Sequence, residues 1–281
     1  MARRERPFIP VDAGDLSAAW FTDVLGPGGS TGPTVSSVDI VEIGDGVGFV
    51  GQIHRCRLEW SEPHHELPRS VVVKMPTTNE TNRGLGETLA LFEREITIYR
   101  DFGADLGLPM PDLLYSAFDP HPAPRVERVL VSILDRLPLR TINWALGKLL
   151  GAGAKSNRRY VLVIEDIADA RPPTQADGGS IDDAAAALRT LARSHARTWN
   201  DAGLATRSPL IWPLDRGMRI VKAGYLKNRQ AFIDLFPDFI DDEIVARLDA
   251  VQEQLLDLTA ELMEPPNTLV HGDYRLDNVL F

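Results

Sequence analysis

The sequence predicts an α+β fold with two lobes, the first built on an antiparallel sheet and the second mainly helical. Short β-branched runs separated by glycine, proline and polar turns dominate the first part of the chain. Further on, apolar residues recur at spacings of three and four, which is typical of amphipathic helices. Strands that precede helices, instead of alternating with them, favour an α+β arrangement. We therefore expect one lobe over residues 1–167 and a second over residues 168–281.

Composition limits the classes of partner and compartment. The formal net charge of −10 argues against nucleic acid or an anionic membrane as the main partner, because both favour a basic face. Cys56 is the only cysteine, so no intrachain disulfide can form. The chain has neither the apolar stretch of a signal peptide nor a run long enough to span a membrane. We expect a cytoplasmic protein, and nothing in the sequence indicates its oligomeric state.

The first lobe is expected to begin with a short helix over residues 12–25. Strands over residues 35–43 and 52–60 would form a hairpin around the glycine-rich turn at residues 44–51. A third strand is expected over residues 70–75.

The clearest helix of this lobe is predicted over residues 87–102. Its periodicity places Glu95 among apolar residues and Glu93 on a polar face. A carboxylate facing the apolar side needs a partner, because an unpaired charge is costly away from water. We expect Glu95 to point inward and to be paired.

The remaining elements follow the same patterns. Ser180 to Asp183 form a capping box that opens a helix ending near residue 200. Further elements are a basic, largely helical segment at 125–152, a strand at 160–164, a crossing between lobes at 168–179, helices at 216–236 and 241–263, and a short strand at 268–270.

The glycine-rich turn carries Gly46, Gly48 and Gly51. This spacing fits a loop whose backbone amides approach the phosphates of a nucleotide. Dinucleotide-binding turns share the spacing but need a helix after the glycines, where a strand is predicted here. An ordinary hairpin turn is the simpler alternative.

Lys74 closes the third strand, one strand after the glycines. A lysine at a strand end is usually just solvated. Together with an inward Glu95, however, it matches the lysine and glutamate that hold nucleotide phosphates in kinases. Phosphate oxygens attract the ammonium group, and the glutamate would hold it in place.

Two further positions have a structural and a functional interpretation. Glu165, Asp166 and Ile167 follow an apolar strand, either as a strand end or as a hinge whose backbone binds adenine. His195 lies on an apolar helix stripe, which favours a packed histidine over a catalytic one.

The most specific motif closes the chain: His271-Gly272-Asp273, followed by Asn278. This spacing is typical of a kinase catalytic loop, in which the Asp accepts the substrate hydroxyl proton and the Asn binds a metal ion. Asp273 is the candidate base, and His271 is expected to orient the loop. Asn278 offers a neutral oxygen that suits Mg²⁺.

Taken in order, these motifs resemble the aminoglycoside phosphotransferase and choline kinase-like superfamily, including its ecdysteroid kinase-like branch. Members are similar in fold to protein kinases. The resemblance implies transfer of the terminal phosphate of ATP, or of GTP, with Mg²⁺, to the hydroxyl group of a small-molecule acceptor. It implies Asp273 as the base, Asn278 as the metal ligand, Lys74 with Glu95 as the phosphate clamp, and residues 165–167 as the hinge.

One part of the family pattern is not found. Members continue beyond the catalytic loop with a strand and a second metal-binding Asp, so this chain is expected to be truncated. Two functions therefore remain open: an active small-molecule kinase, or a nucleotide-binding, catalytically inactive relative that lacks this Asp.

Overall fold

The computed structural model describes residues 7–27, 32–43, 51–120, 133, 136–171, 173, 175–206 and 214–281. The chain divides into two compact units. The first comprises Met1–Pro120, Gly153–Thr198 and Leu269–Phe281, and the second comprises His121–Ala152 and Trp199–Thr268. Each unit joins segments from both sides of residue 167, where the sequence places the lobe boundary, and that boundary stays a prediction.

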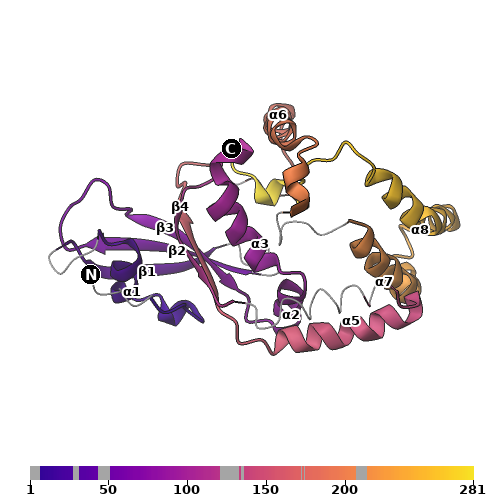
Figure 1. Ribbon diagram of the computed structural model, residues 1–281, viewed down its shortest axis with the longest axis horizontal. Helices are drawn as coiled ribbons and strands as arrows, with labels where there is room; N and C mark the ends of the chain where they lie inside the picture. Colours follow the sequence, from indigo (N-terminus) through magenta and orange to yellow (C-terminus); the bar gives the residue numbers. More distant parts are fainter. Residues whose placement is uncertain are drawn as a thin grey trace. The chain divides into compact units, whose positions relative to one another are not determined.

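The first unit is built on a five-stranded antiparallel sheet in the order β1-β2-β3-β5-β4 (Figure 1). The strands are β1 (Val35–Ile43), β2 (Gly51–Trp60), β3 (Ser70–Pro76), β4 (Leu113–Phe118) and β5 (Tyr160–Glu165). The mixed α+β class is confirmed, and so are four of the five predicted strands. Strand β4 was not predicted, because its six residues are all partly exposed and show no alternation of burial.

The two faces of the sheet pack against different helices. On one face, Val71 and Val73 pack with Trp20 and Phe21 of α1 (Ala18–Leu25). The other face packs against α3 (Leu91–Thr97) through its buried Ile96. Because side chains alternate along a strand, Lys74 lies on the α3 face, whereas Val73 lies on the α1 face.

The helix predicted over residues 87–102 is interrupted, and this part of the prediction is wrong. Helix α2 (Glu80–Thr88) ends before Ala90, which adopts a left-handed conformation with φ 52°. Helix α3 then begins at Leu91, and residues Ile98–Phe102 continue as a π-helix. An alanine in this conformation gives no sequence signal of the kind that glycine or proline provides.

The amino-terminal helix predicted over residues 12–25 is also divided, into a short 3₁₀ turn (Ala13–Asp15) and α1. Other 3₁₀ turns are Gly103–Leu106, Ala202–Thr206 and Leu276–Asn278. The strand expected at residues 268–270 is not formed, and that segment is irregular.

Helix α6 (Ile181–Thr198) begins with the predicted capping box. The Asp183 amide donates to Ser180 Oγ at 3.0 Å, and the Ser180 amide donates to Asp183 Oδ2 at 3.0 Å. The predicted packing stripe is wrong in part, since Leu188 is 64% exposed and Trp199, just beyond the helix, is 57% exposed. The buried positions of this helix are Ser194 and Thr198, and His195 is half-buried.

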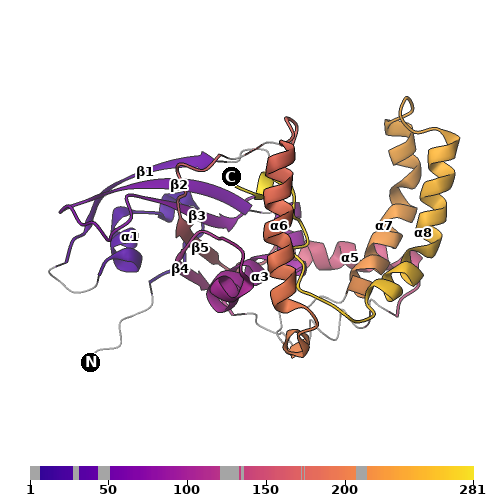
Figure 2. The same ribbon diagram turned by 90° about the horizontal axis from the view of Figure 1, so that it is seen from above.

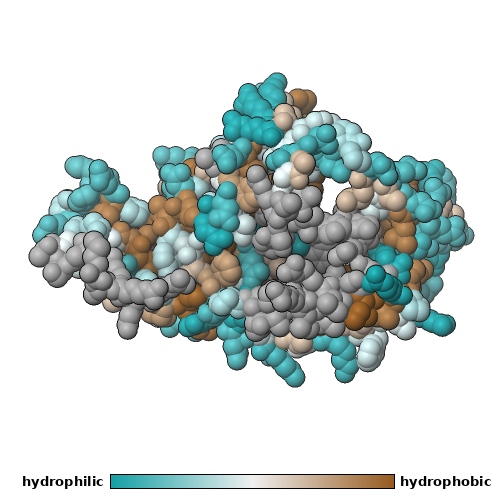
Figure 3. All heavy atoms as spheres, in the orientation of Figure 1, coloured by the Kyte–Doolittle hydropathy of each residue, from teal (hydrophilic) through white to brown (hydrophobic). Residues whose placement is uncertain are grey.

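The second unit contains most of α5 (Leu139–Ala154), together with α7 (Leu214–Leu235) and α8 (Asp242–Leu262). Arg229 of α7 makes two contacts of 2.7 and 2.5 Å with the carboxylate of Asp249 on α8. Apolar side chains remain exposed here, including Leu235 at 70% and Leu262 at 71%, and Figure 3 shows hydrophobic atoms on this part of the surface. Within the described part of the chain, every helix is too short or too polar to cross a bilayer.

Candidate nucleotide and catalytic site

Lys74 and Glu95 form an ion pair between β3 and α3. The Lys74 ammonium donates to Glu95 Oε1 at 2.6 Å. The side chains are 30% and 40% exposed, so the pair is accessible to a ligand. The predicted pairing of this lysine with this glutamate is confirmed.

The surroundings of this pair keep the lysine protonated. Burial by itself lowers the pKa of Lys74, but the Glu95 carboxylate and the nearby Tyr99 outweigh burial and raise it. The pKa of Tyr99 is also raised, chiefly by burial, so its hydroxyl stays neutral beside the pair. Lys74 therefore presents a fixed positive charge on the α3 face of the sheet.

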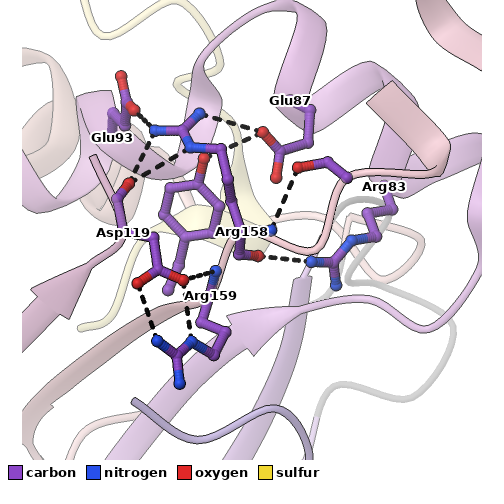
Figure 4. A network of polar contacts seen from close by, with 8 residues as sticks. Arg83, Glu87, Glu93, Asp119, Arg158 and Arg159 are labelled. Atoms are coloured by element: carbon purple, nitrogen blue, oxygen red, sulfur yellow. Dashed lines mark hydrogen bonds and ion pairs between the residues drawn. The ribbon is translucent and has the colours of Figure 1, made fainter. Parts of the chain in front are cut away.

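Glu93, expected on a polar face, is the more buried of the two glutamates on α3. Its side chain is 15% exposed, compared with 40% for Glu95, and it forms an ion pair with Arg158 (Figure 4). The expectation is wrong because Arg158, distant in sequence, packs beside the helix and draws the Glu93 carboxylate inward. No periodicity within the helix could indicate this partner.

Arg158 is the centre of a buried polar network that the sequence did not predict (Figure 4). Its guanidinium reaches Glu87 Oε2 at 3.2 Å and the Asp119 carbonyl oxygen at 3.0 Å. The Tyr160 hydroxyl donates to the same Glu87 oxygen at 3.0 Å. This network joins α2 and α3 to the chain after β4 and before β5.

The neighbouring Arg159 also contacts Asp119, but at the carboxylate and not at the carbonyl oxygen. Its guanidinium donates to both carboxylate oxygens of Asp119, at 2.9 and 3.0 Å, and this bond lowers the pKa of Asp119. Arg83 donates to the Arg158 carbonyl oxygen at 2.6 Å.

The predicted hinge is partly occupied by contacts within the chain. The Asp166 carboxylate is 3% exposed, lies 2.9 Å from Arg55 Nε and accepts from Ser70 Oγ at 2.6 Å. The Asp166 side chain thus fastens the end of β5 to β2 and β3. A role for this residue in nucleotide binding stays a prediction and would involve its backbone.

Two backbone groups of the hinge also have partners. The Glu165 amide donates to the Asp112 carbonyl oxygen at 2.9 Å, and the Ile167 carbonyl oxygen accepts from the Ala170 amide at 3.1 Å. The Ile167 side chain is 38% exposed. An adenine ring at this hinge would therefore have to use other backbone groups.

Asp273 and Asn278 are brought together in the closing loop. Asn278 Nδ2 donates to the Asp273 carbonyl oxygen at 2.8 Å and to Asp273 Oδ2 at 2.9 Å. Gly272 permits the turn before Asp273 because its φ of 82° is unfavourable for other residues. With its amide nitrogen engaged in this way, Asn278 keeps Oδ1 as the atom that suits a metal ion.

His271 contacts two residues of this loop. Its Nδ1 accepts from the Asp273 amide at 3.3 Å, and its ring meets the Tyr274 ring edge-on at 5.6 Å. The Tyr274 hydroxyl in turn donates to the Ala187 carbonyl oxygen of α6 at 2.9 Å. Tyr274, which the sequence did not single out, therefore anchors the loop to α6, and Figure 2 shows the closing segment beside that helix.

Arg275 lies between two carboxylates of the same loop. Its guanidinium is 3.4 Å from Asp273 Oδ1 and 3.0 Å from Asp277 Oδ2. Asp277 also accepts from the Gln175 amide at 2.9 Å, which ties the loop to the segment after the hinge. The final residue makes a similar tie, since the backbones of Arg171 and Phe281 exchange two hydrogen bonds of 2.7 and 3.1 Å.

The predicted site residues thus form three groups in the first unit: the Lys74–Glu95 pair, the hinge, and the closing loop. Among the described residues, no hydrogen bond or ion pair joins the Lys74–Glu95 pair directly to the closing loop. Gly46 and Gly48 lie outside the described residues. Gly51 begins β2 and pairs with Pro76, so a strand follows the glycines and a dinucleotide-binding turn is ruled out.

The donors of the closing loop suit Mg²⁺ in number and kind. Asp273 offers a carboxylate and Asn278 a neutral oxygen, and Mg²⁺ commonly takes one or two protein carboxylates while phosphates and waters complete its shell. Within the described ranges, no cluster of three or more His, Cys, Asp or Glu residues could hold a metal by itself.

The first unit also has a cavity of about 360 Å³. It is lined by Pro10, Val11, Pro76, Arg83, Ser156, Asn157, Arg159 and Tyr160. None of its lining residues belongs to the predicted site, and its two arginines already have partners within the chain.

The sequence matches no known protein-family model, and no curated protein or solved structure shows significant similarity to it.

Proposed function

We propose that this chain has a protein kinase-like, two-lobed fold and binds ATP, or GTP, together with Mg²⁺, in order to phosphorylate a hydroxyl group of a small molecule. The observation that carries the proposal is the ion pair between Lys74 and Glu95. It is supported by the placement of Asp273 and Asn278 in the same compact unit. The protein would act in the cytoplasm.

In this proposal the binding residues neutralise and orient phosphate charge. Lys74 donates to phosphate oxygens while Glu95 holds its ammonium in place. Asn278 Oδ1 would hold the metal ion, which would neutralise charge on the phosphates when bound. Little covalent chemistry is asked of the protein, because positioning and charge neutralisation account for most of the catalysis of phosphoryl transfer.

Asp273 acts as the base. The acceptor oxygen forms a bond to the terminal phosphorus as the bond to the leaving diphosphate breaks, and the hydroxyl proton passes to the Asp273 carboxylate. His271 keeps the loop in position by accepting from the Asp273 amide.

A second function is favoured by the contacts of Asp273 itself. One carboxylate oxygen accepts from Asn278, and the other lies 3.4 Å from Arg275. Both carboxylate oxygens are thus in contact with other side chains of the loop, which limits their access to an acceptor hydroxyl. The alternative is therefore a nucleotide-binding protein without catalytic activity.

Nucleotide binding is tested by thermal unfolding with and without Mg²⁺–ATP. A ligand at a hundred times its Kd stabilises the folded state by about 2.7 kcal/mol. We expect stabilisation of the wild type and its loss in Lys74→Ala. Lys155→Ala, an exposed lysine of the same unit, is the matched control and should behave as the wild type. No stabilisation at millimolar ATP or GTP would refute the proposal.

Turnover separates the two functions. ATP consumption is measured across a panel of hydroxylated compounds for the wild type and for Asp273→Asn. Acceptor-dependent turnover that disappears in Asp273→Asn supports the kinase, whereas nucleotide binding without turnover for any acceptor supports the inactive relative.

A further inference from the structure

Arg158 holds together four segments of the first unit from a buried position (Figure 4). Its side chain is 11% exposed and forms ion pairs with Glu87 of α2 and Glu93 of α3. It also donates to the Asp119 carbonyl oxygen after β4. Glu87 is 6% exposed, so both the guanidinium and its first partner are almost fully removed from water.

Helix α3 connects this network to the nucleotide site. Glu93 and Glu95 are two positions apart, which places them about 200° apart around an α-helix, on nearly opposite sides. Glu93 contacts Arg158, and Glu95 contacts Lys74. Any displacement of α3 at Glu93 therefore also moves the carboxylate that Lys74 requires.

Helix α3 is too short to be stable by itself, so its position depends on its contacts with the rest of the unit. It has seven residues, begins after the left-handed Ala90 and continues into a π-helix at Ile98. Isolated helices of this length are unstable, so tertiary contacts decide where α3 lies. Besides the network and the Lys74–Glu95 pair, α3 contacts the sheet through the buried Ile96 and through Phe92, whose ring centroid lies 5.0 Å from that of Tyr160.

The positive charge of Arg158 compensates the carboxylates of Glu87 and Glu93. Without its guanidinium, Glu87 and Glu93 would be two carboxylates that are largely removed from water and have lost the counter-charge they share. The nearby guanidiniums are already engaged, since Arg159 binds Asp119 and Arg83 donates to a carbonyl oxygen. Removal of Arg158 should therefore drive Glu93, and α3 with it, outward.

We propose that Arg158 is a positioning residue that sets the place of α3 through Glu93 and so keeps Glu95 within reach of Lys74. The effect of Arg158 on nucleotide affinity rests on the proposed function. The effect of Arg158 on the pairing of Lys74 does not, so an experiment can refute the positioning role and the proposed function separately.

The first measurement is the reactivity of Lys74 toward an amine-acylating reagent at pH 8, followed by peptide mass spectrometry. If Glu95 withdraws, its carboxylate no longer opposes the effect of burial, so the pKa of Lys74 falls and more of the amine is unprotonated. We expect Lys74 to be acylated several-fold faster in Glu93→Gln and Arg158→Met, as in the reference variant Glu95→Gln. Arg158→Lys should restore part of the protection, because a lysine supplies the charge without the fork of donors.

Arg159→Met is the matched control, since Arg159 is adjacent but contacts Asp119 and not α3. All variants are compared at a temperature at which each is folded, and Glu93→Gln decides the matter if Arg158→Met does not fold. Unchanged Lys74 reactivity in folded Glu93→Gln would overturn the proposal. An equal increase in Arg159→Met would overturn it as well, because the effect would then be general loosening.

The second measurement is the Kd for Mg²⁺–ATP. We expect Glu93→Gln and Glu95→Gln to weaken binding by similar factors while Arg159→Met leaves it unchanged. If Lys74 becomes more reactive as expected but the wild type binds no nucleotide, the positioning role stands and the proposed function fails. If the wild type binds nucleotide and Glu93→Gln binds it equally well, the positioning role is refuted.

Discussion

The Lys74 ammonium and the Glu95 carboxylate meet at 2.6 Å, which joins the third strand of the sheet to helix α3. Both side chains keep about a third of their surface exposed, at 30% and 40%. The pair therefore combines a fixed position with access for a ligand, and this combination distinguishes it from the more buried pairs of Arg158.

Replacement of Lys74 should affect binding much more than stability. A partly exposed ion pair contributes about 0–1 kcal/mol to folding, whereas a charge-assisted hydrogen bond to phosphate is worth about 1.5–3 kcal/mol. We expect Lys74→Met to weaken Mg²⁺–ATP binding roughly tenfold or more. Titration calorimetry gives the Kd, and urea unfolding gives the stability. A large loss of stability with unchanged affinity would contradict this assignment.

His54 should make the protein less stable in mild acid. It is 4% exposed on β2, burial lowers its pKa, and the nearby Glu42 opposes this effect only in part. Below pH 6.5 the unfolded chain takes up a proton that the folded state resists, so the free energy of unfolding falls as pH decreases.

Urea unfolding from pH 7.5 to 5 checks this dependence on His54. The variant His54→Leu should show a flatter profile in this range, whereas replacement of the exposed His65 should leave it unchanged. A profile for His54→Leu identical to that of the wild type would rule out His54 as the cause.

Cys56 should be unreactive in the folded protein. It is fully buried in the core between the sheet and α1, and burial raises the pKa of its thiol to about 12. Because the thiolate is the reactive form, we expect no modification by a thiol reagent at pH 8 under native conditions and one equivalent in denaturant. Prompt labelling of the native protein would contradict the described packing around β2.

The same shift predicts a loss of stability in strong alkali. Above pH 9.0 the unfolded thiol ionises while the folded thiol stays protonated, so the contribution of Cys56 to stability falls between pH 9.0 and about 12. Cys56→Ala should weaken this dependence, measured as the slope of unfolding free energy against pH, although the variant loses some packing.

Asp166 should act in folding, not in chemistry. Its carboxylate is 3% exposed and bound by Arg55 and Ser70. We expect Asp166→Ala to lower stability by roughly 1–3 kcal/mol, the cost of leaving buried polar partners unpaired. Ser70→Ala should cost less, since Arg55 remains with the carboxylate. Chemical denaturation measures both, and an unchanged stability of Asp166→Ala would contradict the role.

Local sequence patterns determined much of this protein. Runs of apolar and β-branched residues bounded by turns specified β1 to β3 and β5, and the Ser180 capping box specified the start of α6. The pairing of Lys74 with Glu95 could also be predicted, because the resemblance to kinases pairs a lysine of the third strand with a glutamate of a following helix. In each case the determining partners are neighbours along the chain or on adjacent elements.

Other features could be seen only in the tertiary structure. Strand β5 lies between β3 and β4, the predicted helix is interrupted at Ala90, and Glu93 pairs with Arg158. It also gave Asp166 a structural partner in Arg55. These outcomes depend on contacts between residues far apart in sequence, and such contacts form only when the whole unit packs. Propensity and periodicity act over a few residues, so they cannot specify which distant side chain neutralises a buried charge.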